Sequence, residues 1–356
     1  MKNLSIEKKD LLHQGTVIPA HPLALNADYK LDEKKQRGLT RYYIESGAGG
    51  VAVGVHTTQF EIRNPEINLL ETVFKIAAEE IESANLTRPF LKIAGICGQT
   101  DQAISEAKLA VKYGYDLGLV SMAALADRTE EEVLAHVKTI SEIIPVFGFY
   151  LQAAIGGRVY SYDFWKEFVN IPNVLAIKVA AFNRYQTLDV MRALCNSPRK
   201  DEVAMYTGND DNIVADLLTP YQFKINDLKV EKRFVGGLLG HWAVWTRKAV
   251  GLLAEIKETL QSEHASLEKL MARNVEVTDM NAAIFDPANA FHGCIPGVHQ
   301  VLFRQGLLDG IWCLNPKEIL SEGQTEEIDR VCAAYPHLID DDFVKELLSK
   351  NTPIAY

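Results

Sequence analysis

The 356-residue sequence has little of what marks several protein classes. Its five cysteines are spread out with no CxxC pair, so a disulfide framework or a zinc ribbon is not expected. No apolar run approaches the roughly 18 residues of a membrane-spanning helix, and the charged first residues lack the apolar core of a signal peptide. Acidic residues outnumber basic ones by 47 to 37, and the resulting net charge of -10 disfavours nucleic-acid and anionic membrane surfaces. These absences predict a cytoplasmic globular protein without a nucleic-acid or membrane partner.

What the sequence does contain is a repeated alternation of apolar, β-branched runs with helical stretches. The runs follow one another at intervals of roughly 30 residues, the length of a strand plus a helix. Between them, residues 64–84 and 128–144 place apolar side chains at the three- and four-residue spacing of a helix, and Asp127 or Thr129 is suited to cap the second of these. The predicted strands begin near Gly15, Gly49, Phe90, Leu117, Val146, Val174, Glu202 and Arg233.

Eight strand-helix units over residues 15 to about 250 predict an α/β fold of the (β/α)8 TIM-barrel type. A doubly wound open sheet is the structural alternative, but it usually has fewer strands, and no GxGxxG follows the first strand here. Beyond His241 the alternation stops and the apolar spacing is helical throughout. The sequence therefore predicts a catalytic barrel domain over residues 1–241 and a C-terminal helical region over residues 242–356.

One residue stands out in the sixth predicted strand. The stretch PNVLAIKVAAF (residues 172–182) places Lys178 inside an apolar run that holds no acidic partner. Lys178 is the fifth residue of its strand, toward the C-terminal end where barrel enzymes carry their chemistry. Burial lowers the pKa of an amine, and a neutral amine attacks a carbonyl carbon to give a Schiff base. The alternative is a lysine that reaches solvent or an acidic partner on a neighbouring strand, and Lys92, third in its strand, is assigned such a structural role.

Three further strand ends supply candidate groups on the same side of the barrel. Tyr150 closes the fifth strand, where a phenol serves either as a proton relay or as a core aromatic residue. Thr57 and Thr58 follow the second strand, where hydroxyls and turn amides bind a carboxylate or simply fill a strand end. Gly208 follows the seventh strand and suits either close approach to a ligand or an ordinary turn.

Together these stretches resemble the dihydrodipicolinate synthase and N-acetylneuraminate lyase family, the pyruvate-type class I aldolases. The resemblance covers most of the chain, and the lysine and tyrosine segments at their relative spacing are its most specific part. Its motifs are GTVIPAHPL for the first strand, VHTTQF for the GTTGE-like turn, FGFY for the tyrosine strand, PNVLAIK for the lysine strand, YTGNDD for the glycine-aspartate turn and CIPGVHQVLFRQGLL for the C-terminal helical segment.

The resemblance implies a lyase, aldolase or synthase that acts on a 2-oxo acid such as pyruvate without a cofactor or a metal. Lys178 would form the imine and Tyr150 would shuttle protons. Thr57 and Thr58 would hold the substrate carboxylate, and Gly208 would line the pocket. The resemblance also implies a homo-oligomer, either a tetramer or a dimer.

The sequence departs from the synthase pattern where the second substrate would bind. The position expected to carry a carboxylate-binding arginine holds Ile155, and the nearest arginine is Arg158. The synthase tyrosine pair after the fourth strand becomes SMAA at residues 121–124, and Gln59 and Phe60 replace the glycine and glutamate of GTTGE. These departures predict that the second reactant is not that of the lysine-pathway synthase, although a dihydrodipicolinate synthase proper stays an alternative.

Two other classes of function stay open from the residues alone. His21, His56 and His241 end the first, second and eighth predicted strands, with Asp210 or Asp211 after the seventh, a plausible divalent-metal set for a hydrolase or a class II aldolase. Against it, no HxH or HExxH spacing is present. A barrel that has lost its activity and serves only in binding is the remaining alternative.

Overall fold

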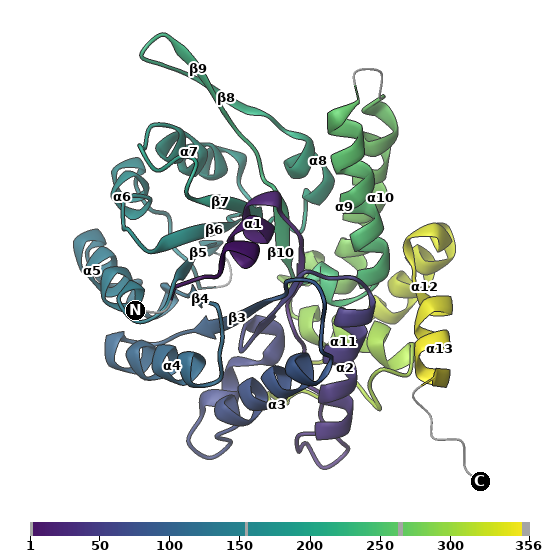
Figure 1. Cartoon of the computed structure of the whole chain (residues 1–356). Coiled ribbons are helices and arrows are strands. Elements are labelled where there is room, and N and C mark those ends of the chain that lie inside the picture. Colours follow the sequence, from purple (N-terminus) through teal and green to yellow (C-terminus); the bar gives the residue numbers. More distant parts are fainter. Residues whose placement is uncertain (1–2, 154–155, 263–265, 351–356) are drawn as a thin grey trace. The chain divides into compact units, whose positions relative to one another are not determined.

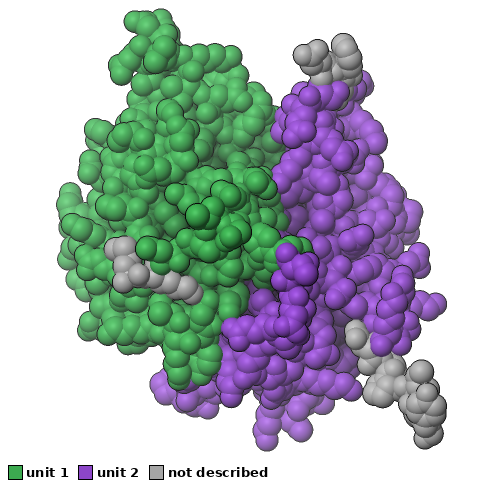
Figure 2. Space-filling model, in the orientation of Figure 1, with its two compact units in different colours: residues 1–16, 88–239 green, residues 17–87, 240–356 purple. Residues whose placement is uncertain are grey.

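A computed structural model describes residues 3–153, 156–262 and 266–350. The chain divides into two compact units, which Figure 2 draws in green and purple. Unit 1 comprises residues 1–16 and 88–239, and unit 2 comprises residues 17–87 and 240–356.

Eight strands occur where the sequence predicted them. In unit 1 six of them form a parallel array in the order β10-β7-β6-β5-β4-β3, and in unit 2 β1 and β2 run parallel through an Ala20–Ala52 bridge. Eight parallel strands with helices between them make a (β/α)8 barrel, which confirms the predicted fold over the open sheet. The bounds are β1 Val17–Pro19, β2 Gly50–Val53, β3 Leu91–Ile96, β4 Leu117–Val120, β5 Val146–Leu151, β6 Val174–Ala180, β7 Ala204–Thr207 and β10 Gly236–Leu239.

Helices follow the strands within each unit. In Figure 1 the unit 1 helices α4 to α7 form an arc outside β3 to β7. The helices of unit 1 are α1 Ile6–Gln14, α4 Thr100–Lys112, α5 Glu130–Ser141, α6 Tyr162–Phe168, α7 Arg184–Cys195 and α8 Ile213–Leu218. Unit 2 holds α2 Glu33–Glu45, α3 Leu70–Ser83, α9 Thr246–Gln261, α10 Glu268–Phe285, α11 Cys294–Arg304, α12 Gln324–Ala334 and α13 Asp341–Lys350.

The start of α5 shows how local chemistry sets a helix boundary. Of the two predicted caps it is Thr129 that serves, since its side chain accepts a hydrogen bond from the Glu132 amide. The Glu132 carboxylate in turn accepts one from the Thr129 amide at 2.8 Å, which completes a capping box.

One feature was missed by the sequence interpretation. Between α8 and β10 the chain forms an antiparallel hairpin of β8 (Tyr221–Ile225) and β9 (Leu228–Lys232), which extends away from the parallel strands of unit 1 in Figure 1. Its two turn residues, Asn226 and Asp227, both have positive φ (47° and 64°), as a two-residue hairpin turn requires. The alternation YQFKI-ND-LKVEK carried this signal.

The described chain after β10 contains helices and no further strand. The predicted division at residue 241 between a catalytic and a helical region stays a prediction. No described helix combines the length and apolar character needed to cross a bilayer.

Candidate active site

Lys178 lies near the C-terminal end of β6, and its side chain is almost fully buried. The residue is 8% exposed, and in register it pairs with Phe149 on β5 and Tyr206 on β7. Its Nζ lies 4.6 Å from the centroid of the Phe149 ring. Paired positions on neighbouring strands share a face, so Lys178, Phe149 and Tyr206 lie on one side of the strands.

Burial changes the acid-base behaviour of this amine. It lowers the pKa of Lys178 to about 8, and the carboxylate of Asp210 opposes the shift. A pKa near 8 leaves about a tenth of the amine neutral and nucleophilic at pH 7, whereas an ordinary lysine has almost none. The prediction of an amine activated by burial is therefore in accord with its surroundings, and its part in catalysis stays a prediction.

Gly208 lies directly against the Lys178 side chain. Its amide donates to the Val179 carbonyl at 2.7 Å, which brings the turn after β7 alongside β6. A methyl group at residue 208 would come within 2.4 Å of the Lys178 Cε and 2.9 Å of the Ala180 Cβ. The lack of a side chain at residue 208 thus allows the close approach of the Lys178 side chain. Its contact with a substrate stays a prediction.

Tyr150 lies on the other side of β5 from Phe149. It pairs in register with Val179 rather than with Lys178, and successive strand residues point to opposite faces. Gly148, on the same face as Tyr150, packs against Phe168 of α6, so this is the side that meets the helices. The structure therefore does not bring Tyr150 to the face that carries Lys178.

The surroundings of Tyr150 are those of a core aromatic residue. Its ring centroid lies 4.7 Å from that of Trp165 and 6.1 Å from that of Tyr160. Burial raises the pKa of Tyr150, and the Tyr160 backbone and the Trp165 indole counteract this in part. Its hydroxyl has no well-formed hydrogen bond to a described residue. The proton-relay role of Tyr150 stays a prediction.

The loop after β5 holds the arginine nearest to the missing carboxylate-binding position. The Arg158 guanidinium donates to the carbonyls of Ala126 (3.3 Å) and Arg128 (2.6 Å) and lies 4.9 Å above the Tyr160 ring. Ile155 lies outside the described residues. Arg158 is thus tied to the loop after β4.

Thr57 and Thr58 lie in unit 2, in the short 3₁₀ helix His56–Thr58 that follows β2. The Thr58 hydroxyl donates to the His21 carbonyl at 2.7 Å and accepts from the Gly54 amide at 2.9 Å, so the backbone already uses it. The Thr57 hydroxyl is buried and hydrogen-bonds to no described residue. Of the two predicted carboxylate ligands, Thr57 is the one with an uncommitted hydroxyl.

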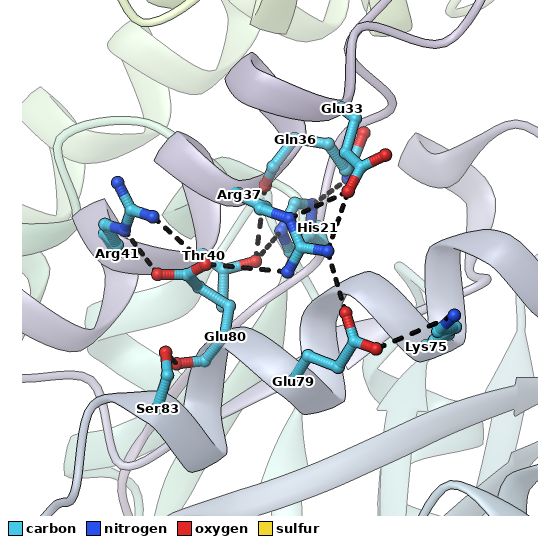
Figure 3. A network of polar contacts seen from close by, with 10 residues as sticks. All are labelled: His21, Glu33, Gln36, Arg37, Thr40, Arg41, Lys75, Glu79, Glu80 and Ser83. Carbon is cyan, nitrogen blue, oxygen red and sulfur yellow. Dashed lines mark hydrogen bonds and ion pairs between the residues drawn. The ribbon is translucent and has the colours of Figure 1, made fainter.

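The histidines proposed for a metal have other partners. The His21 Nε2 lies 2.9 Å from the Thr40 hydroxyl, and its Nδ1 contacts the Pro22 carbonyl and the Gln36 amide at 2.8 and 3.0 Å. Figure 3 shows this ring beside a chain of ion pairs that links α2 to α3. Burial lowers the pKa of His21 and of His241 to about 4. No cluster of three His, Cys, Asp or Glu side chains suited to a metal occurs in the described chain, so the metal alternative gains no support.

Two neighbours of Lys178 were not identified as such by the sequence interpretation. Phe149 supplies an aromatic face to the amine, and Asp210 supplies the charge that acts on it. Both had a signal, since Phe149 precedes the strand-end tyrosine and Asp210 follows the glycine turn. Only the register and the fold of the turn reveal that both lie beside Lys178.

A profile of the dihydrodipicolinate synthetase family matches residues 13–220. The chain belongs to this family. The match includes every predicted site residue and confirms the resemblance drawn from the motifs. Curated relatives are 4-hydroxy-tetrahydrodipicolinate synthases, one from Clostridium novyi (26% identical over 189 residues) and one from Desulforamulus reducens (27% over 202 residues). These alignments cover 52% and 55% of this chain and 60% and 63% of the relatives, so the chain spans about three fifths of their length.

Solved structures of the family share the fold with nearly the whole chain. A monomeric dihydrodipicolinate synthase variant matches with a TM-score of 0.73 and 20% identity, over 91% of this chain and 98% of its own. The N-acetylneuraminate lyase of Fusobacterium nucleatum matches with a TM-score of 0.70 and 16% identity, over 92% of this chain and 100% of its own. At these identities the likeness shows the barrel and its C-terminal helices.

Proposed function

We propose that this protein is a Schiff-base-forming lyase, aldolase or synthase that acts on a 2-oxo acid such as pyruvate through an imine on Lys178. The observation that carries the proposal is the buried amine near the C-terminal end of β6, whose pKa is lowered to about 8 and which faces a glycine that leaves it room. Family membership supports the same chemistry.

The proposed chemistry starts from the neutral form of Lys178. Its Nζ attacks the carbonyl carbon of the 2-oxo acid to give a neutral carbinolamine. The carbinolamine hydroxyl takes up a proton from solvent and leaves as water, which gives the cationic iminium. The iminium accepts the electron pair when a bond to the neighbouring carbon breaks, so one mechanism serves both cleavage and condensation. The Asp210 carboxylate beside Lys178 favours the cation at that position.

The other groups are proposed with unequal support. Thr57 supplies an uncommitted buried hydroxyl for the substrate carboxylate, while Thr58 shapes the turn that presents it. Gly208 leaves room beside Lys178. Tyr150 is proposed as the proton shuttle on the family resemblance alone.

Reductive trapping tests the proposal directly. Borohydride with pyruvate, or with another 2-oxo acid from a panel, should add one reduced substrate mass to the wild type and nothing to Lys178→Ala. Lys92→Ala is the matched control, because Lys92 is also a buried strand lysine of unit 1, with its Nζ 3.5 Å from the Tyr113 carbonyl. Its trapping should equal that of the wild type. Labelling that persists without Lys178, or none with any oxo acid, overturns the imine mechanism.

The synthase reaction is the second candidate, because the curated relatives carry that name. We propose instead that the second reactant differs, since the residues expected to hold its carboxylate are replaced. Condensation of pyruvate with aspartate semialdehyde should be slow. A kcat/KM of about 10⁴ M⁻¹s⁻¹ or more would assign the synthase activity, and a further loss in Arg158→Ala would show that Arg158 replaces the missing guanidinium.

We also propose a cytoplasmic homo-oligomer, a tetramer or a dimer. The support is the acidic composition, the five cysteines without a CxxC pair and the assembly implied by the family resemblance. One structural neighbour is described as a monomeric dihydrodipicolinate synthase variant. Light scattering on the purified protein gives the mass, and a monomer at micromolar concentration contradicts this proposal.

A further inference from the structure

A buried carboxylate in unit 1 lies behind the turn that contacts Lys178. Asp216, on α8, has no exposed surface. Its Oδ2 accepts hydrogen bonds from the Thr207 hydroxyl (2.7 Å) and the Asn209 side-chain amide (2.8 Å). Its Oδ1 accepts from the Asn212 amide (3.0 Å) and forms an ion pair with the Arg184 guanidinium. Four donors thus converge on one carboxylate, which compensates the large cost of burying its charge.

These donors belong to two different turns of the barrel. Thr207 ends β7, and Asn209 lies in the turn that leads to α8. Arg184 begins α7, directly after the turn that follows β6. A second bond joins the same turns, because the Asn209 side-chain oxygen accepts from the Phe182 amide at 2.9 Å. Phe182 has a φ of +49°, so this turn holds a conformation that a bulky residue adopts only when its surroundings fix it.

The turn that Asp216 holds carries both groups that act on Lys178. Gly208 contacts the lysine side chain, and its amide is bonded to the strand that bears it. The Asp210 amide donates to the Gly208 carbonyl at 3.1 Å, which keeps the Asp210 carboxylate in the same turn. A shift of this turn would change the space around the amine and the charge next to it together.

We propose that Asp216 is a positioning residue that joins the turns after β6 and β7 and thereby holds Gly208 and Asp210 beside Lys178. The inference rests on the proposed role of Lys178 in imine formation. The hydrogen bonds and the ion pair of Asp216 described above are to residues of the two turns and the helices that follow them and not to Lys178, so it would act on the amine through the turn.

Asp216→Asn removes the charge with little change in volume. The new amide nitrogen would replace one acceptor oxygen and would face either the donors of Thr207 and Asn209 or those of Asn212 and Arg184, so the turn loses bonds and relaxes. Burial is the largest influence on the Lys178 amine, with Asp210 opposing it, and a looser turn admits water. The pKa of Lys178 should then rise from about 8 toward its ordinary value. One unit of rise leaves about tenfold less neutral amine at neutral pH.

The pH dependence of a substrate-free labelling reaction tests this. Cyanate carbamoylates neutral amines, and peptide mass spectrometry follows Lys178 alone across pH 6 to 11. In the wild type, the pH midpoint of Lys178 labelling should lie near the pKa of about 8. In Asp216→Asn this pH midpoint should be about one unit or more higher. Arg184→Gln keeps the three neutral donors to Asp216 and should shift the pH midpoint less. This variant provides the test if Asp216→Asn does not fold.

Asp116→Asn is the matched control. Asp116 is also a buried carboxylate of unit 1, bonded to the Lys92 amide (2.9 Å) and the Lys8 Nζ (2.7 Å), but it precedes β4 at the opposite end of the strands. Its midpoint should equal that of the wild type. An unchanged midpoint in both Asp216→Asn and Arg184→Gln overturns the inference, as does an equal shift in Asp116→Asn, since that would reflect general loosening.

Trapping with pyruvate in the same preparations separates this inference from the proposed function. A wild type that traps no oxo acid but shows the midpoint difference refutes the imine mechanism and leaves the positioning by Asp216 standing. Efficient trapping at Lys178 without a midpoint difference refutes only the role of Asp216.

Discussion

Replacing Gly208 by alanine should strongly slow imine formation while leaving the protein folded. The added methyl carbon would lie 2.4 Å from the Lys178 Cε and 2.9 Å from the Lys178 Cγ and the Ala180 Cβ. Carbon atoms in contact prefer separations of about 3.5–4.0 Å, so the groups must move apart by roughly 1 Å. The Cε is the most mobile of these atoms, so we expect the Lys178 side chain to be displaced.

Two magnitudes follow from this displacement. A misplacement of about 1 Å in a reacting group costs on the order of 100-fold in rate, so the trapping rate with pyruvate should fall by about that factor. The cost of overpacking is about 1–3 kcal/mol in unfolding free energy, which a folded domain usually survives. Gly208 does not have positive φ, so the effect comes from the close approach and not from backbone strain.

Gly38→Ala provides the comparison. Gly38 lies within α2, and a methyl group there meets nothing within 4 Å. This substitution should raise unfolding free energy by about 0.5–1 kcal/mol, because alanine favours a helix, and should leave trapping unchanged. The measurements are pseudo-first-order trapping followed by intact mass, and urea unfolding. Trapping in Gly208→Ala at the wild-type rate would show that the placement of the Lys178 side chain does not matter for imine formation.

Four further outcomes are expected. Because the pKa of Lys178 is about 8, the wild-type trapping rate should rise as the pH increases from 6 to 8 and level off above 9, and a flat profile would contradict an amine that is protonated at low pH. Thr57→Val should raise the KM for pyruvate by about 10- to 100-fold with little change in stability. Thr58→Val should lower the unfolding free energy by about 1–3 kcal/mol, because the Gly54 amide loses its hydrogen bond to the Thr58 hydroxyl. The reverse pattern in kinetics and urea unfolding would exchange their roles. Tyr150→Phe should slow turnover roughly 100-fold if its hydroxyl is the relay, with stability nearly unchanged because no well-formed hydrogen bond is lost; unchanged turnover assigns it to the core. Burial lowers the pKa of His21, His241 and His299 to about 4, whereas these rings titrate near pH 6.5 in the unfolded chain. The unfolded chain therefore binds protons first as the pH falls. The unfolding free energy should decrease between pH 6.5 and 4, by up to about 3 kcal/mol for each group. Equal urea midpoints at pH 7 and pH 4.5 would show that these rings are not held neutral.

The sequence by itself determined the eight parallel strands and the residue at the centre of the candidate site. Each strand is a short apolar run, and such runs are local signals, so all eight were found near their observed positions. The cap of α5 was limited to two residues by type alone, and geometry chose Thr129 because Glu132 lies three residues later. Lys178 could be identified from the sequence because a charged side chain within an apolar strand is unusual wherever that strand lies in the fold.

The tertiary structure alone decided which groups share a face with that lysine. Alternation along β5 separates Phe149 from Tyr150, but the register with β6 and the packing of α6 determine which of the two faces the amine. Asp216 and Arg184 are 32 residues apart in sequence, and no local pattern predicts that they meet. Their pairing needs the turns after β6 and β7 to lie side by side, since burial and charge act through space and not along the chain. For the same reason, the pKa of Lys178 could be inferred only from the tertiary structure, which shows the groups that surround its amine.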